Sequence, residues 1–350
     1  AYDTNSNRVV IAYGDATNYY GKAVVGTVSG GGVSFGTPVV FNSAMTTSIQ
    51  PNHSIAFDSN SNKVVIVYKD NGNSNYGTAI VGTVDPSDNS ISFGSEAVFE
   101  SAHTTHPVVA FDSNSNKVLI SYKDYDDSQR GKAIVGTISG TSISFGSAAQ
   151  FSSNSTSLLS TVFDSSNNKV IIAYRDVTAS NAGKAVVATI SGTSVSFGTA
   201  VQFDANADYI SASFDSDTNK VILSYFLDAD TDSGQAVVGT VSGTAISFGT
   251  PVTFASVPAA RISSAYDTSA KKTVVFYRDG TNSDLGKVVE LETSGTSLTA
   301  SSIQQFSATT TSSTSSVYDP DNLKTVTSYI DEGNSSDLET VLFTGTTITR

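Results

Sequence analysis

The sequence contains no cysteine and no tryptophan, and it has only one methionine and three histidines. The lack of cysteine excludes disulfides, thiolate metal sites and thiol nucleophiles. No apolar run approaches the ~20 residues that a membrane-spanning helix needs, so we expect no membrane insertion. Positive charge is also scarce, because 19 Lys and Arg stand against 32 Asp and Glu, for a net charge of −13. Such a charge repels phosphate backbones, and nucleic acid is therefore not an expected partner.

What the sequence does contain is an internal repeat, which is the first feature to look for in a chain of this kind. An aromatic residue followed by Asp anchors each copy, and consecutive anchors are 51 to 55 positions apart. The seven anchors are Tyr2, Phe57, Phe111, Phe163, Phe214, Tyr266 and Tyr318.

Each copy reads as four short strands separated by turns. In the second copy, the polar turn at residues 58–63 precedes an apolar run at residues 64–68, and a polar loop at residues 70–77 precedes a second run at residues 78–84. The runs are rich in β-branched residues and too short for helices, which is typical of strands buried on both faces. Four strands per copy, repeated seven times, predict an all-β, seven-bladed β-propeller that occupies residues 1–350 as one domain. A β-solenoid and a string of small β domains are the alternatives.

The two ends of the chain predict an incomplete blade. The first copy lacks nearly all of its first strand, and the last copy stops at Arg350, where other copies have the phenylalanine of a Ser-Phe-Gly motif. We expect residues outside this sequence, or a neighbouring molecule, to complete the terminal blade. A domain of a longer parent chain is the first interpretation, and self-assembly is the second.

Most aromatic residues recur at fixed places in the copies, and we expect them to fill the core between neighbouring sheets. These places are the anchor, the Tyr that closes the second strand, the Phe of the Ser-Phe-Gly motif and the Phe that closes the fourth strand. Three aromatic residues outside this pattern, Phe226, Phe276 and Phe343, lie in or beside strand-like runs and also read as core.

The remaining five aromatic residues are all Tyr, and they map to one face of the predicted ring. A four-strand meander places the second-to-third loops and the blade-to-blade loops together, and these loops differ between copies. Variable loops on a rigid scaffold commonly carry function, and Tyr suits contact with a sugar ring or a protein. The candidate ligand-binding residues are Tyr19, Tyr20, Tyr76, Tyr125, Arg130, Tyr209, His103 and His106. The alternative is that each Tyr covers apolar atoms of its own loop, and that the histidines are exposed loop residues.

Two sets of Asp recur, one in the first turn and one two positions after the strand-closing Tyr. Their regularity indicates a structural role, since Asp accepts backbone N–H bonds in tight turns. The fifth copy departs from this pattern with Asp228, Asp230 and Asp232 at alternate positions ahead of Gly234. This spacing resembles a calcium-binding hairpin of some propellers, although Ser233 stands where that motif has Gly. Ca²⁺ is therefore a candidate cofactor, and a solvated acidic loop is the alternative.

The repeated phrases at residues 57–70, 76–84 and 142–147 carry a resemblance. They are similar to repeats of structural and tail-fibre-like proteins of marine bacteriophages and of secreted bacterial adhesins. The resemblance implies a virion or extracellular surface protein that binds a cell envelope, and it transfers no catalytic residue. Fucose-binding seven-bladed lectins share the gross architecture, but their sugar sites rely on Trp, which is absent here.

The sequence contains no Ser–His–Asp motif, nucleophile elbow, phosphate loop or HExxH motif. We therefore predict a non-enzymatic binding or adhesion module for a cell-surface glycan or protein, located outside the cell or on a virion. A purely architectural subunit of a fibre or surface layer is one alternative. A propeller lyase or glycoside hydrolase is the other.

Overall fold

The computed structural model describes residues 1–15, 17–45, 52–227, 232–334, 337–345 and 347–349. Within these residues the regular structure is β, apart from the single 3-10 turn η1 (Val177–Ala179). The prediction of an all-β chain is thus confirmed. The described residues contain no helix that is long and apolar enough to cross a membrane.

The strands follow the sequence repeat, and each copy forms an antiparallel meander. The first strands of the copies are β1 (Tyr2–Asp3), β6 (His53–Asp58), β19 (Asp208–Asp215), β24 (Ala259–Asp267) and the second halves of the long strands β10 (Ala97–Asp112), β14 (Ala149–Asp164) and β28 (Gln304–Asp319). The second strands are β2 (Arg8–Asp15), β7 (Lys63–Asp70), β11 (Lys117–Asp124), β15 (Lys169–Asp176), β20 (Lys220–Leu227), β25 (Lys272–Asp279) and β29 (Lys324–Asp331).

The third strands are β3 (Tyr20–Ser29), β8 (Tyr76–Asp85), β12 (Arg130–Ser139), β16 (Ala182–Ser191), β21 (Ser233–Ser242), β26 (Leu285–Ser294) and β30 (Asp337–Thr344). Each pairs with a short fourth strand, namely β4 (Gly32–Phe35), β9 (Ser90–Phe93), β13 (Ser142–Phe145), β17 (Ser194–Phe197), β22 (Ala245–Phe248), β27 (Ser297–Ala300) and β31 (Thr347–Thr349). A continuation of the fourth strand pairs with the same third strand, either as β5 (Val39–Asn42), β18 (Val201–Asp204) and β23 (Val252–Ala255) or as the first halves of β10, β14 and β28.

The recurrent Asp residues have the structural role predicted for them. In the first turn of the second copy, Asp58 accepts hydrogen bonds from the backbone N–H groups of Asn60 (2.8 Å) and Ser61 (3.1 Å). The anchor Asp of every other copy makes the same two bonds. The Asp that ends the second strand also accepts a backbone N–H bond, as Asp70 does from Gly72. These bonds satisfy turn N–H groups that the strands leave unpaired.

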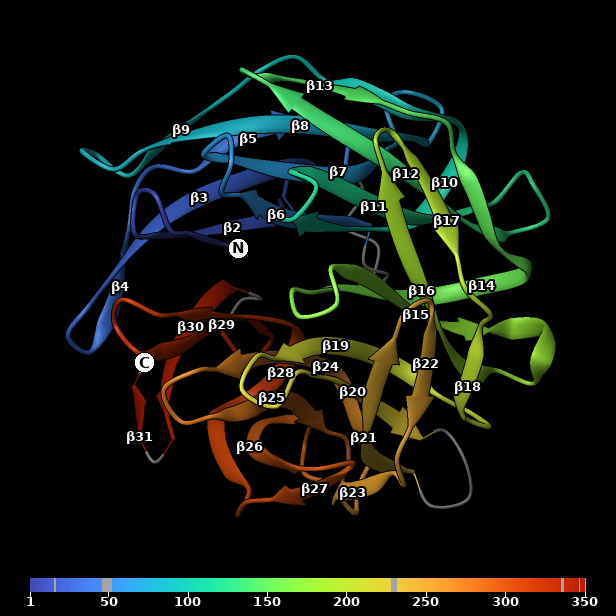
Figure 1. Cartoon of the computed structure of the whole chain (residues 1–350). Helices are drawn as coiled ribbons and strands as arrows, with labels where there is room; N and C mark the ends of the chain where they lie inside the picture. The colour runs from blue at the N-terminus through green and yellow to red at the C-terminus, as the bar shows by residue number, and fades with distance from the viewer. Residues whose placement is uncertain (16, 46–51, 228–231, 335–336, 346, 350) are drawn as a thin grey trace.

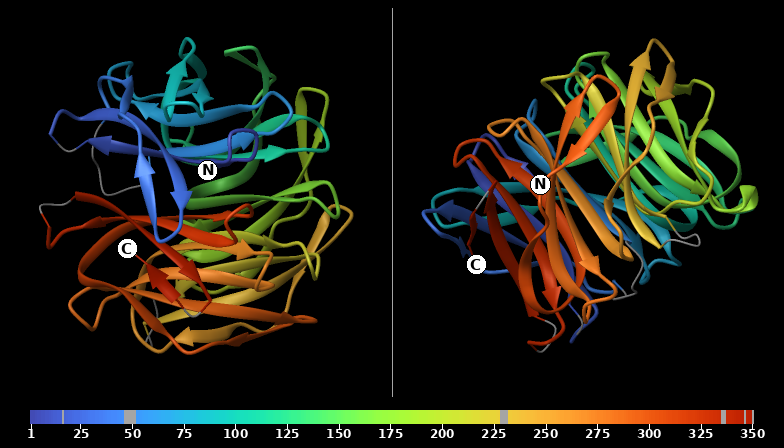
Figure 2. Two further views of the ribbon diagram at one scale, coloured as in Figure 1. Left: turned by 90° about the vertical axis from the view of Figure 1, so that its left-hand side faces the viewer. Right: turned by 90° about the horizontal axis from the view of Figure 1, so that it is seen from below.

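The innermost strands lie side by side in chain order around a common axis. Strands β6, β10, β14, β19, β24 and β28 each contact the next, and β1 contacts both β28 and β6. The chain ends therefore meet, and Figures 1 and 2 show the blue N-terminal strands beside the red C-terminal ones. Two hydrogen bonds join them, from the Tyr2 hydroxyl to Asp321 and from the Lys324 ammonium to the Gly30 carbonyl.

The core lies in the wedges between neighbouring copies, as predicted. The Phe that closes one fourth strand packs on the Tyr that closes the second strand of the next copy, for example Phe151 on Tyr174 with ring centroids 5.2 Å apart. The other such pairs have centroids 5.1 to 5.5 Å apart. A glycine lies beneath each Phe, and a Cβ placed on Gly183 would lie only 2.5 Å from the Phe203 ring.

Three groups of aromatic residues are less buried than a core role predicts. Five of the seven anchor rings are only partly buried, namely Phe57, Phe111, Phe163, Phe214 and Tyr318. The Ser-Phe-Gly rings lie at the outer edge of the wedges, and Phe35 is 42% exposed. Phe226 is only half-buried because it lies near the mouth of the ring, where it contacts Tyr209. Phe276 and Phe343 are buried, as the sequence predicted.

Candidate functional site

Five of the innermost strands share an irregularity five positions before the anchor. Strands β10, β14, β19, β24 and β28 each shift register there, as at Thr105 and Val108 in β10. One residue in each bulge adopts a left-handed backbone conformation, with φ between 46° and 54°, and these residues are His106, Leu158, Tyr209, Arg261 and Ser313. A bulge re-aims a side chain, and left-handed non-glycine residues are uncommon outside functional sites and turns. We refer to the five residues as the bulge ring.

Three members of the bulge ring line a cavity of about 320 Å³. His106, Leu158 and Tyr209 come from the adjacent inner strands β10, β14 and β19. The cavity lies at the end of these strands that carries the variable loops, because the residues around His106 pair with the last residues of β11. The other lining residues are Lys123, Gln129, Ser157, Arg175, Val177 and Asp208.

Charged groups on one side of the cavity are organised around Arg175. One terminal nitrogen of its guanidinium lies 3.1 Å from Asp208 Oδ2, and its Nε donates to Ser157 Oγ at 3.0 Å. This pairing fixes the planar guanidinium and balances its charge with one carboxylate.

Lys123, by contrast, has no carboxylate within 4.0 Å among the described residues, although the residue is only 8% exposed. Its ammonium lies 5.8 Å from the centroid of the Tyr125 ring. Burial lowers the pKa of Lys123, and the neighbouring Arg175 charge lowers it further. A second lysine, Lys69, has a pKa that burial also lowers. The mouth of the ring thus concentrates positive charge in a molecule that is strongly negative as a whole.

The positive charges at the mouth of the ring affect the pKa of His106. Burial lowers its pKa to about 4, and the charges of Lys123, Arg175 and Lys69 contribute in the same direction. The imidazole is therefore neutral at neutral pH and can donate or accept a hydrogen bond without adding charge. The pKa of His103 is lowered by burial and by the two lysines, against the opposing charge of Asp126.

The structure brings together some of the residues predicted from sequence. His106 and Tyr209 line the cavity. His103 stacks on Tyr125, with ring centroids 4.6 Å apart, and the two form a rim beside Lys123. Tyr209 also contacts Arg261, whose guanidinium carbon lies 5.1 Å from the ring centroid.

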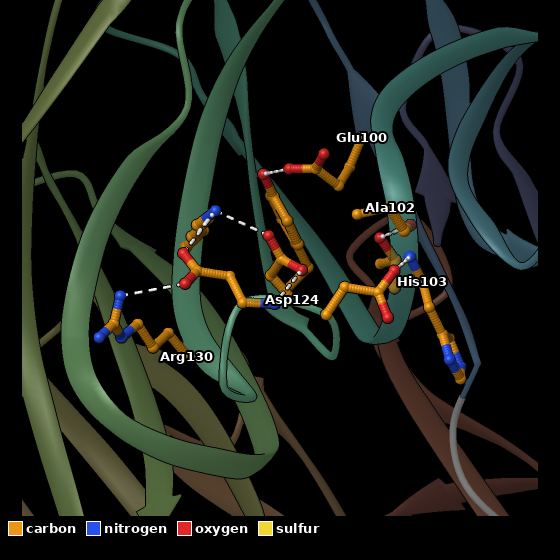
Figure 3. Close-up of polar contacts among 10 residues, drawn as sticks. Glu100, Ala102, His103, Asp124 and Arg130 are labelled. Carbon is orange, nitrogen blue, oxygen red and sulfur yellow. Dashed lines mark hydrogen bonds and ion pairs between the residues drawn. The ribbon is translucent and has the colours of Figure 1, made fainter.

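Other candidates lie outside the cavity lining. Tyr20, Tyr76 and Arg130 each begin a third strand, where they are partly exposed. Arg130 pairs with Asp127 at 3.0 Å, and Figure 3 shows it and His103 on opposite sides of Asp124. Tyr19 is 57% exposed in its loop.

The calcium hypothesis falls mostly outside the part of the chain that the structure describes. Asp228 and Asp230 are not among the described residues, and Asp232 is exposed with a φ of 40°. Among the described side chains, no group of three His, Cys, Asp or Glu is arranged to hold a metal ion. Calcium binding at this loop remains a prediction.

Sequence reasoning missed the other seven lining residues, namely Lys123, Gln129, Ser157, Leu158, Arg175, Val177 and Asp208. A comparison of the copies distinguishes three of them, Lys123, Leu158 and Arg175. The residue directly after the strand-closing Tyr varies where its neighbours are constant, and it reads Gly14, Lys69, Lys123, Arg175, Phe226, Arg278 and Ile330 along the chain. The bulge position varies in the same way, which distinguishes both positions from the blade framework.

The sequence matches no known family profile and no curated protein. The fold does match solved structures. One is the BP39L lectin of Burkholderia pseudomallei, with 10% identity over 98% of this chain and 97% of that one and a TM-score of 0.67. The chain has a β-propeller fold. A periplasmic gluconolactonase of Pseudomonas aeruginosa is also similar to this propeller, with 14% identity, coverage of 98% and 94% and a TM-score of 0.66. The SapL1 lectin in complex with alpha methyl fucoside shares 11% identity over 86% and 95% of the chains, with a TM-score of 0.51.

Proposed function

We propose that this propeller is a non-enzymatic carbohydrate-binding module whose ligand occupies the cavity at the bulge ring. The observation that carries the proposal is the composition of the cavity. It combines apolar and aromatic surface from Leu158, Val177 and Tyr209 with convergent polar groups from His106, Lys123 and Ser157. Sugars need this combination, because their rings have apolar faces and polar edges. Lectins among the structural neighbours support the same function.

The number of blades and the location of the protein are also part of this proposal. We propose a single seven-bladed domain spanning residues 1–350, since the seven anchors recur with near-constant spacing. We also propose an extracellular or virion-surface location with a role in adhesion, for which the resemblance to phage fibre proteins and secreted adhesins is the support.

A glycan array followed by calorimetric titration of the strongest binders tests the proposed function. Tyr209→Asn should weaken binding at least about tenfold, because it removes the aromatic wall while Asn tolerates the left-handed backbone. Tyr19→Asn is the matched control, since Tyr19 also has a left-handed backbone, with φ of 59°, but lies outside the cavity. Loss of binding in the Tyr19 variant alone would contradict the assignment of the site. The absence of any glycan ligand would contradict the proposed function.

The gluconolactonase neighbours favour a second candidate, hydrolysis of a sugar lactone. Neutral His106 beside a fixed guanidinium could act as a general base for a water molecule. Turnover of gluconolactone by the wild-type protein, lost in His106→Asn and kept in Tyr19→Asn, would establish this alternative. We expect no turnover above the rate of the uncatalysed reaction.

A further inference from the structure

We infer that the cavity selects an acidic sugar, namely a saccharide unit bearing a single carboxylate that pairs with the Lys123 ammonium. This inference rests on the proposed carbohydrate-binding function and names the class of its ligand. It derives from how positive charge is distributed in the molecule, from the absence of a partner for Lys123 and from the composition of the cavity.

Most Lys and Arg residues of the chain either begin a strand or form an ion pair within their own copy. One Lys or Arg begins each second strand on the turn face, as Lys169 does in β15. On the variable face, Lys22, Lys132 and Lys184 pair with the Asp that ends the second strand of the same copy, at 2.6 to 2.8 Å. These ion pairs fix the loops and leave no net charge to attract a ligand.

Lys69 and Lys123 break this arrangement. Both follow the strand-closing Tyr, and neither has a hydrogen-bond or ion-pair partner for its ammonium in the described part of the chain. Lys123 is more than nine-tenths buried and lines the cavity. The stem of the side chain is buried, whereas its ammonium stays open to solvent, and no described residue supplies a counter-charge to it. A ligand carboxylate at this place would supply both a charge and hydrogen-bond acceptors.

The cavity also limits how much negative charge the ligand carries. Asp208 supplies a carboxylate to the same lining, and it is already held by Arg175. Asp208 would repel a second anionic group, and the net charge of −13 repels polyanions at longer range. The volume of about 320 Å³ is at the lower end of the range for ligand sites, which suits one or two sugar rings. One carboxylate among several hydroxyls, as in a uronic acid, satisfies these constraints better than a sulfated polymer.

The test compares methyl glycosides of uronic acids with their carboxyl methyl esters and with the parent hexosides, by calorimetric titration at low salt. We expect the uronides to bind at least about tenfold more tightly than the uncharged compounds, as for a hydrogen bond to a charged group. Lys123→Met should remove this preference while keeping the length of the side chain. Lys169→Met, at the opposite end of the neighbouring copy, should leave it unchanged.

A second readout follows the histidine itself. A carboxylate bound at Lys123 neutralises a charge that acts on His106, so it should raise the pKa of His106 measured by NMR titration, whereas the methyl ester should not. A purely structural role for Lys123 would not produce this difference between ligands.

Three outcomes would overturn the inference, and only the third of them also overturns the proposed function. If uncharged hexosides bind as tightly as uronides, and Lys123→Met changes neither, carbohydrate binding stands and the charge selection is wrong. If acetate competes as well as a uronide, the cavity recognises a carboxylate without a sugar, and the inference also fails. If no saccharide binds at all, both the inference and the proposed function fail.

Discussion

Acidification should destabilise the protein through His106. Its imidazole is buried at the cavity, where Lys123, Arg175 and Lys69 oppose a further positive charge and Asp208 is committed to Arg175. The pKa of His106 is consequently lowered from 6.5 to about 4 in the folded protein. Above pH 6.5 the group is neutral in both states. Between pH 6.5 and about 4 the unfolded chain takes up the proton first, so folding stability falls as the pH falls.

The size of the effect follows from the shift. A difference of about 2.5 pKa units, at 1.36 kcal/mol for each unit, corresponds to about 3 kcal/mol of stability that is present at pH 7 and lost near pH 4. Globular proteins unfold with an entropy of about 2.1 cal/mol/K per residue, so this loss lowers the melting temperature of a 350-residue chain by about 4 °C. Other titrating groups also lower the stability of the protein at acid pH. The contribution of His106 is therefore measured as the difference between the wild type and a variant that lacks this histidine.

Replacing His106 by Asn isolates this contribution, because Asn tolerates the left-handed backbone and does not titrate. We expect the melting temperature of the variant to fall by about 4 °C less than that of the wild type between pH 7 and pH 4. NMR provides the direct check, since only three histidines are present and the variant identifies one imidazole resonance by its loss. An equal fall in both proteins, or a His106 resonance that titrates near pH 6.5, would refute this reasoning.

Three further predictions concern the blade framework and the acidic loop. Gly183→Ala should lower the free energy of unfolding, measured by urea denaturation, by about 1–3 kcal/mol, because the added Cβ would overlap a phenylalanine ring. Gly32→Ala is the control and should change this free energy by less than about 0.5 kcal/mol, because the space around Gly32 is open. Tyr225→Phe should cost about 1.5–3 kcal/mol through loss of a 2.7 Å hydrogen bond to a carboxylate, and Tyr277→Phe should be close to neutral, because the Tyr277 hydroxyl is buried with no hydrogen-bond partner among the described residues. Calcium should raise the melting temperature of the wild type and not that of Asp230→Ala; an equal rise in both would place any calcium elsewhere.

The strands, turns and core contacts could be predicted from sequence because every copy uses the same residues for them. The strand-closing Tyr and the fourth-strand Phe recur at constant spacing, since every wedge between copies needs the same rings. The anchor Asp recurs because every first turn needs the same two N–H acceptors. Residues that recur at constant spacing are therefore the ones that make the same contact in every copy.

The cavity was only partly predictable, because it is assembled from residues that the repeat leaves free. Tyr209 was identified because it lies outside the repeated aromatic positions, and His106 because the chain has only three histidines. Lys123 and Arg175 were not, because a cation after a strand reads as an ordinary exposed residue. Their convergence depends on the curvature of the ring and on the bulges of the inner strands, which no local pattern encodes.

The left-handed backbone of the bulge ring has a consequence for how this protein can change. A non-glycine residue in that conformation costs about 1–2 kcal/mol, and a glycine would relieve this strain at a smaller entropic cost of about 0.5–1 kcal/mol. Glycine would therefore serve the backbone at least as well at all five positions, yet the chain has His106, Leu158, Tyr209, Arg261 and Ser313 there. The backbone of the bulge ring therefore does not dictate which side chain stands there, so new specificities can be introduced by exchanging these residues while the wedges stay intact.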